Sequence, residues 1–179
     1  MRLTGLVVAA AAFLGGCFYS DEALIGRFSA DFPLPEGDYS HTPHHPDGRA
    51  FAQATWTGEI VHRGGRYHSD SPDFPHEGAR FREIADGLYI VMRPDEEFWL
   101  YGLVRVFPDG VAAYYLPDCA ELSEAVREDY DIVEHEEEPG FCRVDDWDRL
   151  SGAMLSWLAT QGDAPPMDGV YRPVAPDRD

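Results

Sequence analysis

Two Asp-Gly turns constrain the stretch from Ala79 to Leu116, and this stretch organises the rest of the chain. Asp86-Gly87 and Pro108-Asp109-Gly110 each separate segments rich in β-branched, aromatic and large aliphatic residues. An Asp-Gly pair reaches positive φ at low steric cost, so it favours a tight antiparallel return of the chain. We therefore expect an antiparallel meander, with strands over residues 79–85, 88–93, 97–107 and 111–116.

Short strands are expected on both sides of this meander. Gly-x-Tyr tripeptides, in which the glycine ends a turn and the tyrosine enters a strand, begin at Gly37, Gly65, Gly87 and Gly169. Residues 54–63 are also typical of a strand, and the Gly64-Gly65 pair that follows is a two-residue hairpin signal. In total the sequence predicts about six to eight antiparallel strands.

After the meander the sequence takes on a helical period. Asp118, with a glutamate three positions later, forms a capping-box pattern at the start of a helix expected over residues 120–129. Asp145 or Asp146 can cap a second helix over residues 147–160. We expect its apolar stripe to face the core; the stripe consists of Trp147, Leu150, Met154, Trp157 and Leu158. The predicted fold class is α+β: an antiparallel β-meander with two short C-terminal helices.

The chain has a strong excess of acid. It contains 33 Asp and Glu against 14 Lys and Arg, every one of them Arg, which gives a formal net charge of −19. Nucleic-acid binding needs clustered cations, and anionic lipid headgroups attract basic segments. The composition therefore argues against a nucleic-acid partner and against electrostatic docking on anionic lipid. An apolar content of 44% is enough for a folded core.

The N-terminus carries a secretion pattern followed by a cysteine. Arg2 precedes an apolar run over residues 6–14, which is shorter than the roughly 20 residues that span a bilayer. The run leads into Leu14-Gly15-Gly16-Cys17, which closely resembles the lipobox of bacterial lipoproteins. The resemblance covers residues 1–17 only, and it implies that Cys17 receives a diacylglyceryl group and that the signal is cut before it. An ordinary secretory signal and an uncleaved membrane helix are the alternatives.

The same resemblance implies a location and a domain plan. Residues 1–16 would be a lipoprotein signal peptide, residues 17–35 a lipidated N-terminus and tether, and residues 36–179 a single β-rich globular domain with a helical C-terminal part. The acyl chains on Cys17 would hold the protein in a lipid bilayer, with the domain facing the periplasm of the cell envelope. Phe18 stands where lipoproteins retained in the inner membrane typically carry Asp, so the resemblance mildly favours the outer membrane.

With Cys17 assigned to lipid, two cysteines remain for an oxidising compartment. A Cys119–Cys142 disulfide is the economical pairing. It would close a loop of about 24 residues and stabilise the fold by roughly 3 kcal/mol. We expect it to join the starts of the two helices. Free thiols or a redox pair are the alternatives, although the chain has no Cys-x-x-Cys spacing.

One loop concentrates candidate metal ligands, namely His41, His44, His45 and Asp47. Imidazole together with carboxylate suits zinc, copper or nickel, and His62 and His68 could join the group. Two prolines interrupt this loop, however, and the spacing matches no standard zinc signature. A solvated loop is therefore the competing interpretation, and the sequence predicts no cofactor.

Other signals of chemistry are weak. Gly-x-Ser-x-Gly and Gly-rich phosphate loops are absent, and no lysine chemistry is possible. The acidic run Glu134–Glu138 offers oxygen ligands for Ca²⁺ but lacks the frame of a calcium loop. We predict no enzyme but a membrane-anchored extracytoplasmic lipoprotein, whose domain is structural or presents a surface to an envelope partner. The alternative is a small-ligand binder with an apolar cavity in a curled antiparallel sheet. A third hypothesis is an envelope enzyme or metal binder that uses the His-rich loop.

Overall fold

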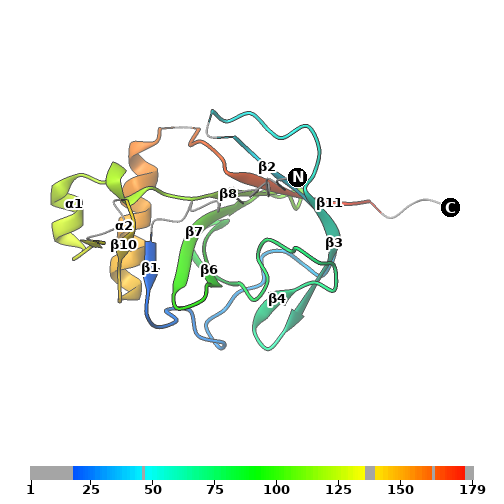
Figure 1. The fold of residues 1–179 in the computed structure, drawn as a ribbon, viewed down its shortest axis with the longest axis horizontal. Coiled ribbons are helices and arrows are strands. Elements are labelled where there is room, and N and C mark those ends of the chain that lie inside the picture. The colour runs from blue at the N-terminus through cyan, green and yellow to red at the C-terminus, as the bar shows by residue number, and fades with distance from the viewer. Residues whose placement is uncertain (1–17, 46, 136–139, 163, 176–179) are drawn as a thin grey trace, which may run out of the picture.

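The computed structural model describes residues 18–45, 47–135, 140–162 and 164–175 (Figure 1). Cys17 and the predicted signal peptide therefore lie outside the described residues. None of the helices in these ranges is long and apolar enough to cross a membrane. In chain order the elements are β1 (Phe18–Ser20), β2 (Gly37–Pro43), β3 (Trp56–Arg63), β4 (Arg66–His68), β5 (Arg80–Ala85), β6 (Leu88–Pro94), β7 (Trp99–Val106), β8 (Ala112–Tyr115), the 3-10 helix η1 (Cys119–Glu121), α1 (Glu124–Asp129), β9 (Val133–Glu134), β10 (Cys142–Arg143), α2 (Trp147–Thr160) and β11 (Gly169–Pro173).

The predicted meander forms the middle of the sheet. Strands β5, β6, β7 and β8 pair in that order, and each is antiparallel to the next. Gly87 and Gly110, at the two Asp-Gly turns, have φ values of 65° and 81°. These are the left-handed conformations for which a glycine is needed. The four expected strands and their antiparallel pairing are therefore confirmed.

The complete sheet is larger and more varied than expected. Its strand order is β4-β3-β2-β11-β8-β7-β1-β10-β9, and β6 and β5 extend from the other edge of β7. One edge of β7 thus pairs with β6, while its opposite edge pairs with β8 and then with β1. Strand β1 runs parallel to β10. The α+β class is confirmed, but the purely antiparallel sheet of fewer strands was wrong, because the described residues form an eleven-stranded sheet with one parallel pair.

The segment expected to be a tether contributes to the folded domain from its first described residue. Phe18 is fully buried, and β1 pairs with β7 and β10. Ser20 Oγ and the Tyr101 hydroxyl share a hydrogen bond of 2.6 Å. Ile25 and Leu34 are also buried. Burying large apolar side chains is worth about 1.5–3 kcal/mol each, so β1, Ile25 and Leu34 anchor this segment to the domain, although residues such as Phe28 between them are exposed.

The middle of the sheet, at β6, β7 and β8, is buried on both faces, which explains why β7 carries large residues on both of its sides. Figure 1 shows α1 and α2 outside one part of the sheet, while β2, β3 and β4 curl around the opposite face. We name the two clusters the helix-side core and the inner core. The helix-side core includes Phe18, Leu88, Ile90, Met92, Tyr101, Leu103, Leu150, Met154 and Trp157. The inner core includes Tyr39, Trp56, Ile60, Tyr67, Phe74, Phe81, Val104, Tyr114 and Tyr171.

The second predicted helix is confirmed, and the first is divided. α2 covers residues 147–160, and the carboxylate of Asp146 caps it by accepting hydrogen bonds from two backbone N–H groups of its first turn. Leu150, Met154 and Trp157 of its stripe are buried in the helix-side core. The segment 120–129 instead forms η1, capped by Asp118, and α1, capped by Ser123. Ser is a strong N-cap residue, so Ser123 starts a new helix where one continuous helix was expected.

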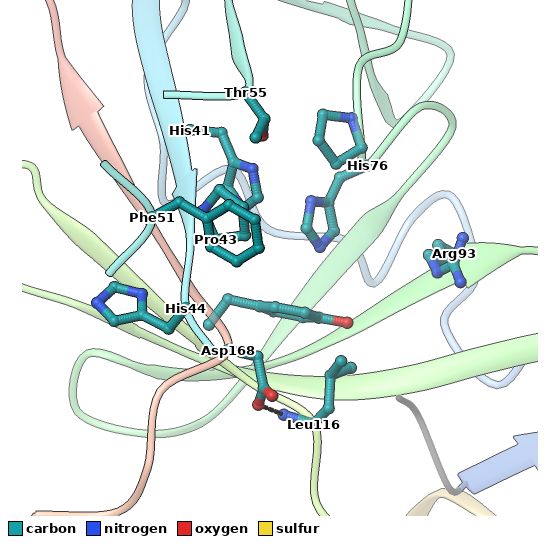
Figure 2. A pocket seen from close by; sticks show the side chains of 11 residues that line it. His41, Pro43, His44, Phe51, Thr55, His76, Arg93, Leu116 and Asp168 are labelled. Carbon is teal, nitrogen blue, oxygen red and sulfur yellow. Dashed lines mark hydrogen bonds between the residues drawn. The ribbon is translucent and has the colours of Figure 1, made fainter. Parts of the chain in front are cut away.

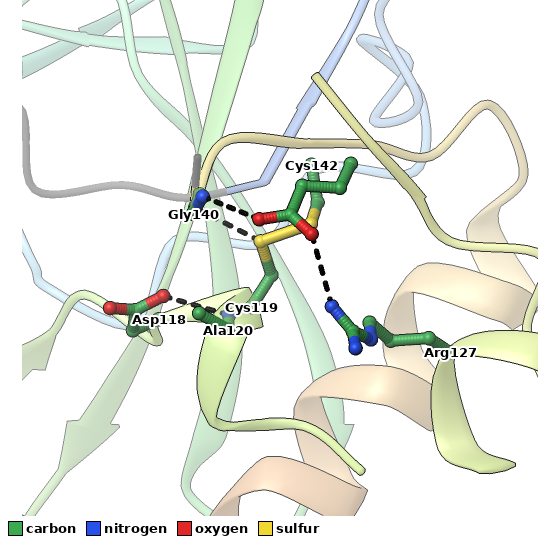
Figure 3. Close-up of a disulfide and its surroundings, with 7 residues drawn as sticks. Asp118, Cys119, Ala120, Arg127, Gly140 and Cys142 are labelled. Carbon is green, nitrogen blue, oxygen red and sulfur yellow. Dashed lines mark hydrogen bonds and ion pairs between the residues drawn. A yellow bond between two sulfur atoms is a disulfide. The ribbon is translucent and has the colours of Figure 1, made fainter. Parts of the chain in front are cut away.

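Cys119 and Cys142 form the predicted disulfide, with Cα atoms 6.1 Å apart (Figure 3). One of its attachments differs from the expectation, because Cys142 lies in β10 and not at the start of α2. Since β10 pairs with β1, the bridge ties η1 to the strands beside the meander. Next to it, Glu134 forms an ion pair with Arg127 and accepts a hydrogen bond from Gly140 N.

Candidate functional site

A cavity of about 430 Å³ opens at the rim of the curled sheet, next to the inner core (Figure 2). The ends of β2 and β8 and the start of β11 form its base, and the loops before β3 and before β5 contribute further walls. Its apolar wall consists of Pro43, Phe51, Pro75 and Leu116. Its polar wall includes His41, His44, His76, Arg93, Tyr114 and Asp168.

His41 faces inward because of its register on β2. Tyr39 and His41 are buried, whereas Ser40 between them is partly exposed, as alternation along a strand requires. The His41 ring lies 4.6 Å from the Tyr171 ring on β11, measured between centroids. Gly169 makes room for it, because a Cβ at that position would lie 2.5 Å from His41 Nε2. Strand pairing and one glycine therefore bring an imidazole to the cavity wall.

His41 is uncharged at neutral pH. Burial, aided by the neighbouring His44, lowers its pKa from 6.5 to about 4. Nδ1 of His41 and Nδ1 of His44 are both buried, and neither has a hydrogen-bond partner within the described protein. Such an unsatisfied atom costs about 1–3 kcal/mol, and native proteins satisfy most of them. Both nitrogens are therefore unsatisfied polar atoms in residues of the cavity wall.

His76 separates the cavity from the inner core. Its Nδ1 and the Tyr171 hydroxyl share a hydrogen bond of 2.5 Å, and its ring meets that of Tyr114 edge-on at 4.5 Å. Burial lowers the pKa of His76 to about 3, and His41 and Arg93 act in the same direction. Burial also raises the pKa of Tyr171 well above its usual value. Both groups are therefore neutral, and this wall is polar without being charged.

Asp168 is held in place by the backbone around it. Its own N–H donates to Tyr114 O, and its carbonyl accepts from His44 N. Its carboxylate Oδ2 accepts a hydrogen bond of 2.6 Å from Leu116 N. Burial raises the pKa of Asp168, although the Leu116 hydrogen bond and His44 partly offset this effect. The cavity thus contains a partly buried carboxyl group in a fixed position.

Arg93 supplies the positive charge of this site. It lies on β6, is partly buried and lines the cavity. Within the described ranges neither Arg93 nor Asp168 takes part in an ion pair. In Figure 2 the Arg93 guanidinium lies well apart from Asp168 and His44. The two opposite charges therefore face one cavity without neutralising each other.

The structure separates the predicted metal ligands. His41 and His44 both reach the cavity, but the His45 ring stacks on Phe51 and Asp47 pairs with Arg49. No group of three or more His, Cys, Asp or Glu side chains among the described residues is placed to hold a metal ion.

The other candidate ligands are engaged elsewhere. His62 Nε2 hydrogen-bonds Leu34 O, and His68 Nδ1 pairs with Glu77. Of the acidic run, Glu134 pairs with Arg127, and residues 136–138 lie outside the described residues.

Sequence reasoning missed most of the cavity. His76, Arg93, Tyr114 and Asp168 come from four separate segments that only the sheet order brings together. The one local signal was the His-rich loop, which identified His41 and His44.

Comparison with protein-family models, curated proteins and solved structures finds no match for this chain. The site must therefore be interpreted from its own chemistry. Its neutral imidazoles and phenol can exchange hydrogen bonds with a guest, its rings can stack on an apolar body, and its two separated charges can orient that body. These are the kinds of groups with which a cavity can hold a small molecule.

Proposed function

We propose that this protein binds a small organic molecule in the cavity lined by His41, His76, Arg93 and Asp168. The observation that carries the proposal is a cavity of about 430 Å³ whose walls combine apolar side chains with His41, His44 and His76. Ligand pockets usually have volumes of about 300–1,000 Å³, with mostly apolar walls and a few well-placed polar groups. The expected alternative, an apolar cavity within a curled sheet, is thus favoured, although the cavity lies at the rim and residues fill the interior.

The walls support binding because they are already in position. The Asp168 carboxylate is held by a hydrogen bond from Leu116 N, and His76 is held by Tyr171. A preorganised site spends less free energy on ordering its own side chains when a ligand arrives. The structural or partner-presenting role has weaker support, since the large exposed apolar side chains come from separate segments: Phe28, Phe32, Phe107, Val133, Leu155 and Val174.

For the location we propose a lipid anchor at Cys17, supported by the lipobox resemblance. The Cys119–Cys142 disulfide is consistent with an oxidising compartment. Because β1 begins at Phe18, such an anchor would hold the folded domain close to the membrane surface. Mass spectrometry of the membrane-extracted protein should give a chain that begins at Cys17 with added acyl mass. A chain that begins at Met1 without added mass would refute the anchor.

Filling the cavity tests the binding proposal. Thr55 is exposed at the cavity wall, so Thr55→Trp should occupy the space without disturbing the core. Amide NMR titration of a library of small aromatic compounds should shift resonances of His41, His76 and Asp168 in the wild type. Thr55→Trp should weaken these interactions about tenfold or more, because the guest loses much of its contact surface.

Thr57→Trp is the matched control, because Thr57 is exposed on β3 and does not line the cavity. It should bind the same compounds as the wild type does. If the library produces shifts only outside the cavity, or if Thr55→Trp binds as well as Thr57→Trp, the proposed function is wrong.

A further inference from the structure

Two charged groups of opposite sign face the cavity, and neither has a counter-ion among the described residues. Arg93 approaches from β6, and Asp168 stands at the start of β11. Some described arginines form ion pairs, such as Arg143 with Asp145 and Arg149 with Asp131, whereas Arg93 is among those that form none. Arg93 is therefore an unneutralised cation in a chain whose formal net charge is −19.

The groups between these two charges are uncharged and largely aromatic. His41 and His76 are buried and neutral at neutral pH, since burial lowers their pKa values to about 4 and about 3. Phe51 and Tyr114 also line the cavity and add aromatic ring surface to its walls. The cavity is thus dipolar, with an anionic end, a cationic end and an apolar, hydrogen-bonding middle.

A dipolar cavity selects its guest by charge. A partly buried charge without a counter-ion has lost part of its hydration and received little in return. A guest that brings a cation to Asp168 and an anion to Arg93 restores both interactions at once. A guest with one charge satisfies one end only, and a neutral guest satisfies neither. The His44 side chain lies next to Asp168 at the anionic end of the cavity (Figure 2).

We infer that the ligand is a small zwitterion with an apolar or aromatic body, such as a free amino acid, whose ammonium group lies near Asp168 and His44 and whose carboxylate pairs with Arg93. This inference rests on the proposed function and specifies its ligand. Arg is well suited to the carboxylate, because its planar guanidinium forms two parallel hydrogen bonds with it. The overall acidity of the chain repels a simple anion, so the ammonium end also aids approach.

Four probes that share one aromatic body separate the charges: phenylalanine, phenylalanine amide, N-acetylphenylalanine and N-acetylphenylalanine amide. The first carries both charges, the second only the cation, the third only the anion and the fourth neither. Their dissociation constants for the full folded domain are measured by NMR titration at neutral pH. The zwitterion should bind at least about tenfold more tightly than either singly charged probe, as expected for one charge-assisted hydrogen bond.

Two charge-removing variants assign each end. Arg93→Gln should remove the advantage of phenylalanine over its amide, while binding of the amide itself stays unchanged. Asp168→Asn should remove the advantage of phenylalanine over its N-acetyl derivative, and the asparagine oxygen can still accept from Leu116 N. The matched controls are Arg105→Gln, on β7, and Asp109→Asn. Like Asp168, the wild-type Asp109 carboxylate accepts a hydrogen bond from a backbone N–H group, in this case that of Val111. Both controls should bind all four probes as the wild type does.

The outcomes separate this inference from the proposed function. If all four probes bind equally well in the cavity, or if a singly charged probe binds best, the zwitterion assignment is overturned and the binding function stands. The same holds if Arg93→Gln leaves the preference for the carboxylate intact. If none of the four probes and no compound of the library shifts a cavity resonance of the folded protein, both conclusions fail together.

Discussion

The two faces of the central sheet differ in how closely their side chains are packed and in how many polar groups they contain. On the helix side, Leu103, Leu150 and Met154 are completely buried and a disulfide lies nearby. On the inner side, the packing ends at a cavity whose wall contains buried imidazoles with unsatisfied nitrogens. Close packing of apolar residues without polar groups maximises stability. An open rim with polar groups gives up part of that stability, and the proposed binding site lies at this rim.

The residue types on the two faces differ accordingly. The helix-side core is mainly aliphatic, whereas rings dominate the inner core. Glycines admit these rings on the inner side: a Cβ at Gly102 would lie 2.8 Å from a ring atom of Tyr114, as one at Gly169 would meet His41. Rings are rigid and can present both an apolar face and a polar tip. The inner face can therefore be closely packed at its centre, while the polar groups of its rings line the cavity at its rim.

A pair of leucine truncations should show this difference most strongly. Leu103→Ala removes side-chain volume from the closed helix-side core and should lower the free energy of unfolding by about 3–5 kcal/mol. Leu116→Ala enlarges a cavity that is already open, so its cost should stay below about 1 kcal/mol. Urea unfolding followed by tryptophan fluorescence gives both values. Equal costs would show that the cavity wall is packed as tightly as the core, and the contrast between the faces would disappear.

Removing the disulfide should weaken the helix side without changing the cavity. The Cys119→Ala/Cys142→Ala variant should lose about 3 kcal/mol, because the cross-link no longer restricts the unfolded chain. Reduction of the wild type by a thiol should lower its stability by a similar amount. The folded variant should bind the aromatic probes with unchanged dissociation constants, since neither cysteine lines the cavity. Weaker binding by the folded variant would show that the two faces are coupled.

Local signals in the sequence predicted the helix side and the meander well. Asp-Gly turns are decided by neighbouring residues, so the bounds of β5, β6, β7 and β8 came close to their expected positions. The apolar stripe of α2 and its Asp146 cap lie within one segment, and both were recognised. The Cys119–Cys142 pairing followed from counting, once the lipobox resemblance removed the third cysteine.

Features that depend on contacts distant in sequence were not predictable in this way. The N-terminal β1 has only three residues, and its place between β7 and β10 follows from the edges that those strands leave free. The cavity joins residues as far apart as His41 and Asp168, which are neighbours only because β2 pairs with β11. His76 lies in the loop before β5, yet it is buried against the inner core. No periodicity within a single segment signals such a position.

The buried His41 on the inner face should make the stability of the protein sensitive to acid. Unfolded His41 takes up a proton near pH 6.5, whereas folded His41 does so only near pH 4, because burial lowers its pKa. Between these values the unfolded state binds more protons, so stability is complete above about pH 6.5 and falls as the pH decreases. His44, His76 and Tyr171 surround the ring, and no carboxylate is among its contributing neighbours. The loss is therefore attributable to the imidazole itself.

His41→Phe should remove this contribution, since it keeps a ring at the position without a group that titrates. Between about pH 7.5 and pH 4.5, the variant should lose about 2 kcal/mol less stability than the wild type does. The many carboxylates affect both proteins equally, so the difference between their pH profiles isolates His41. If the stability of the wild type and of His41→Phe changed with pH in the same way, His41 would be accessible to water in the folded protein. The inner face would then carry no free-energy cost for burying this imidazole.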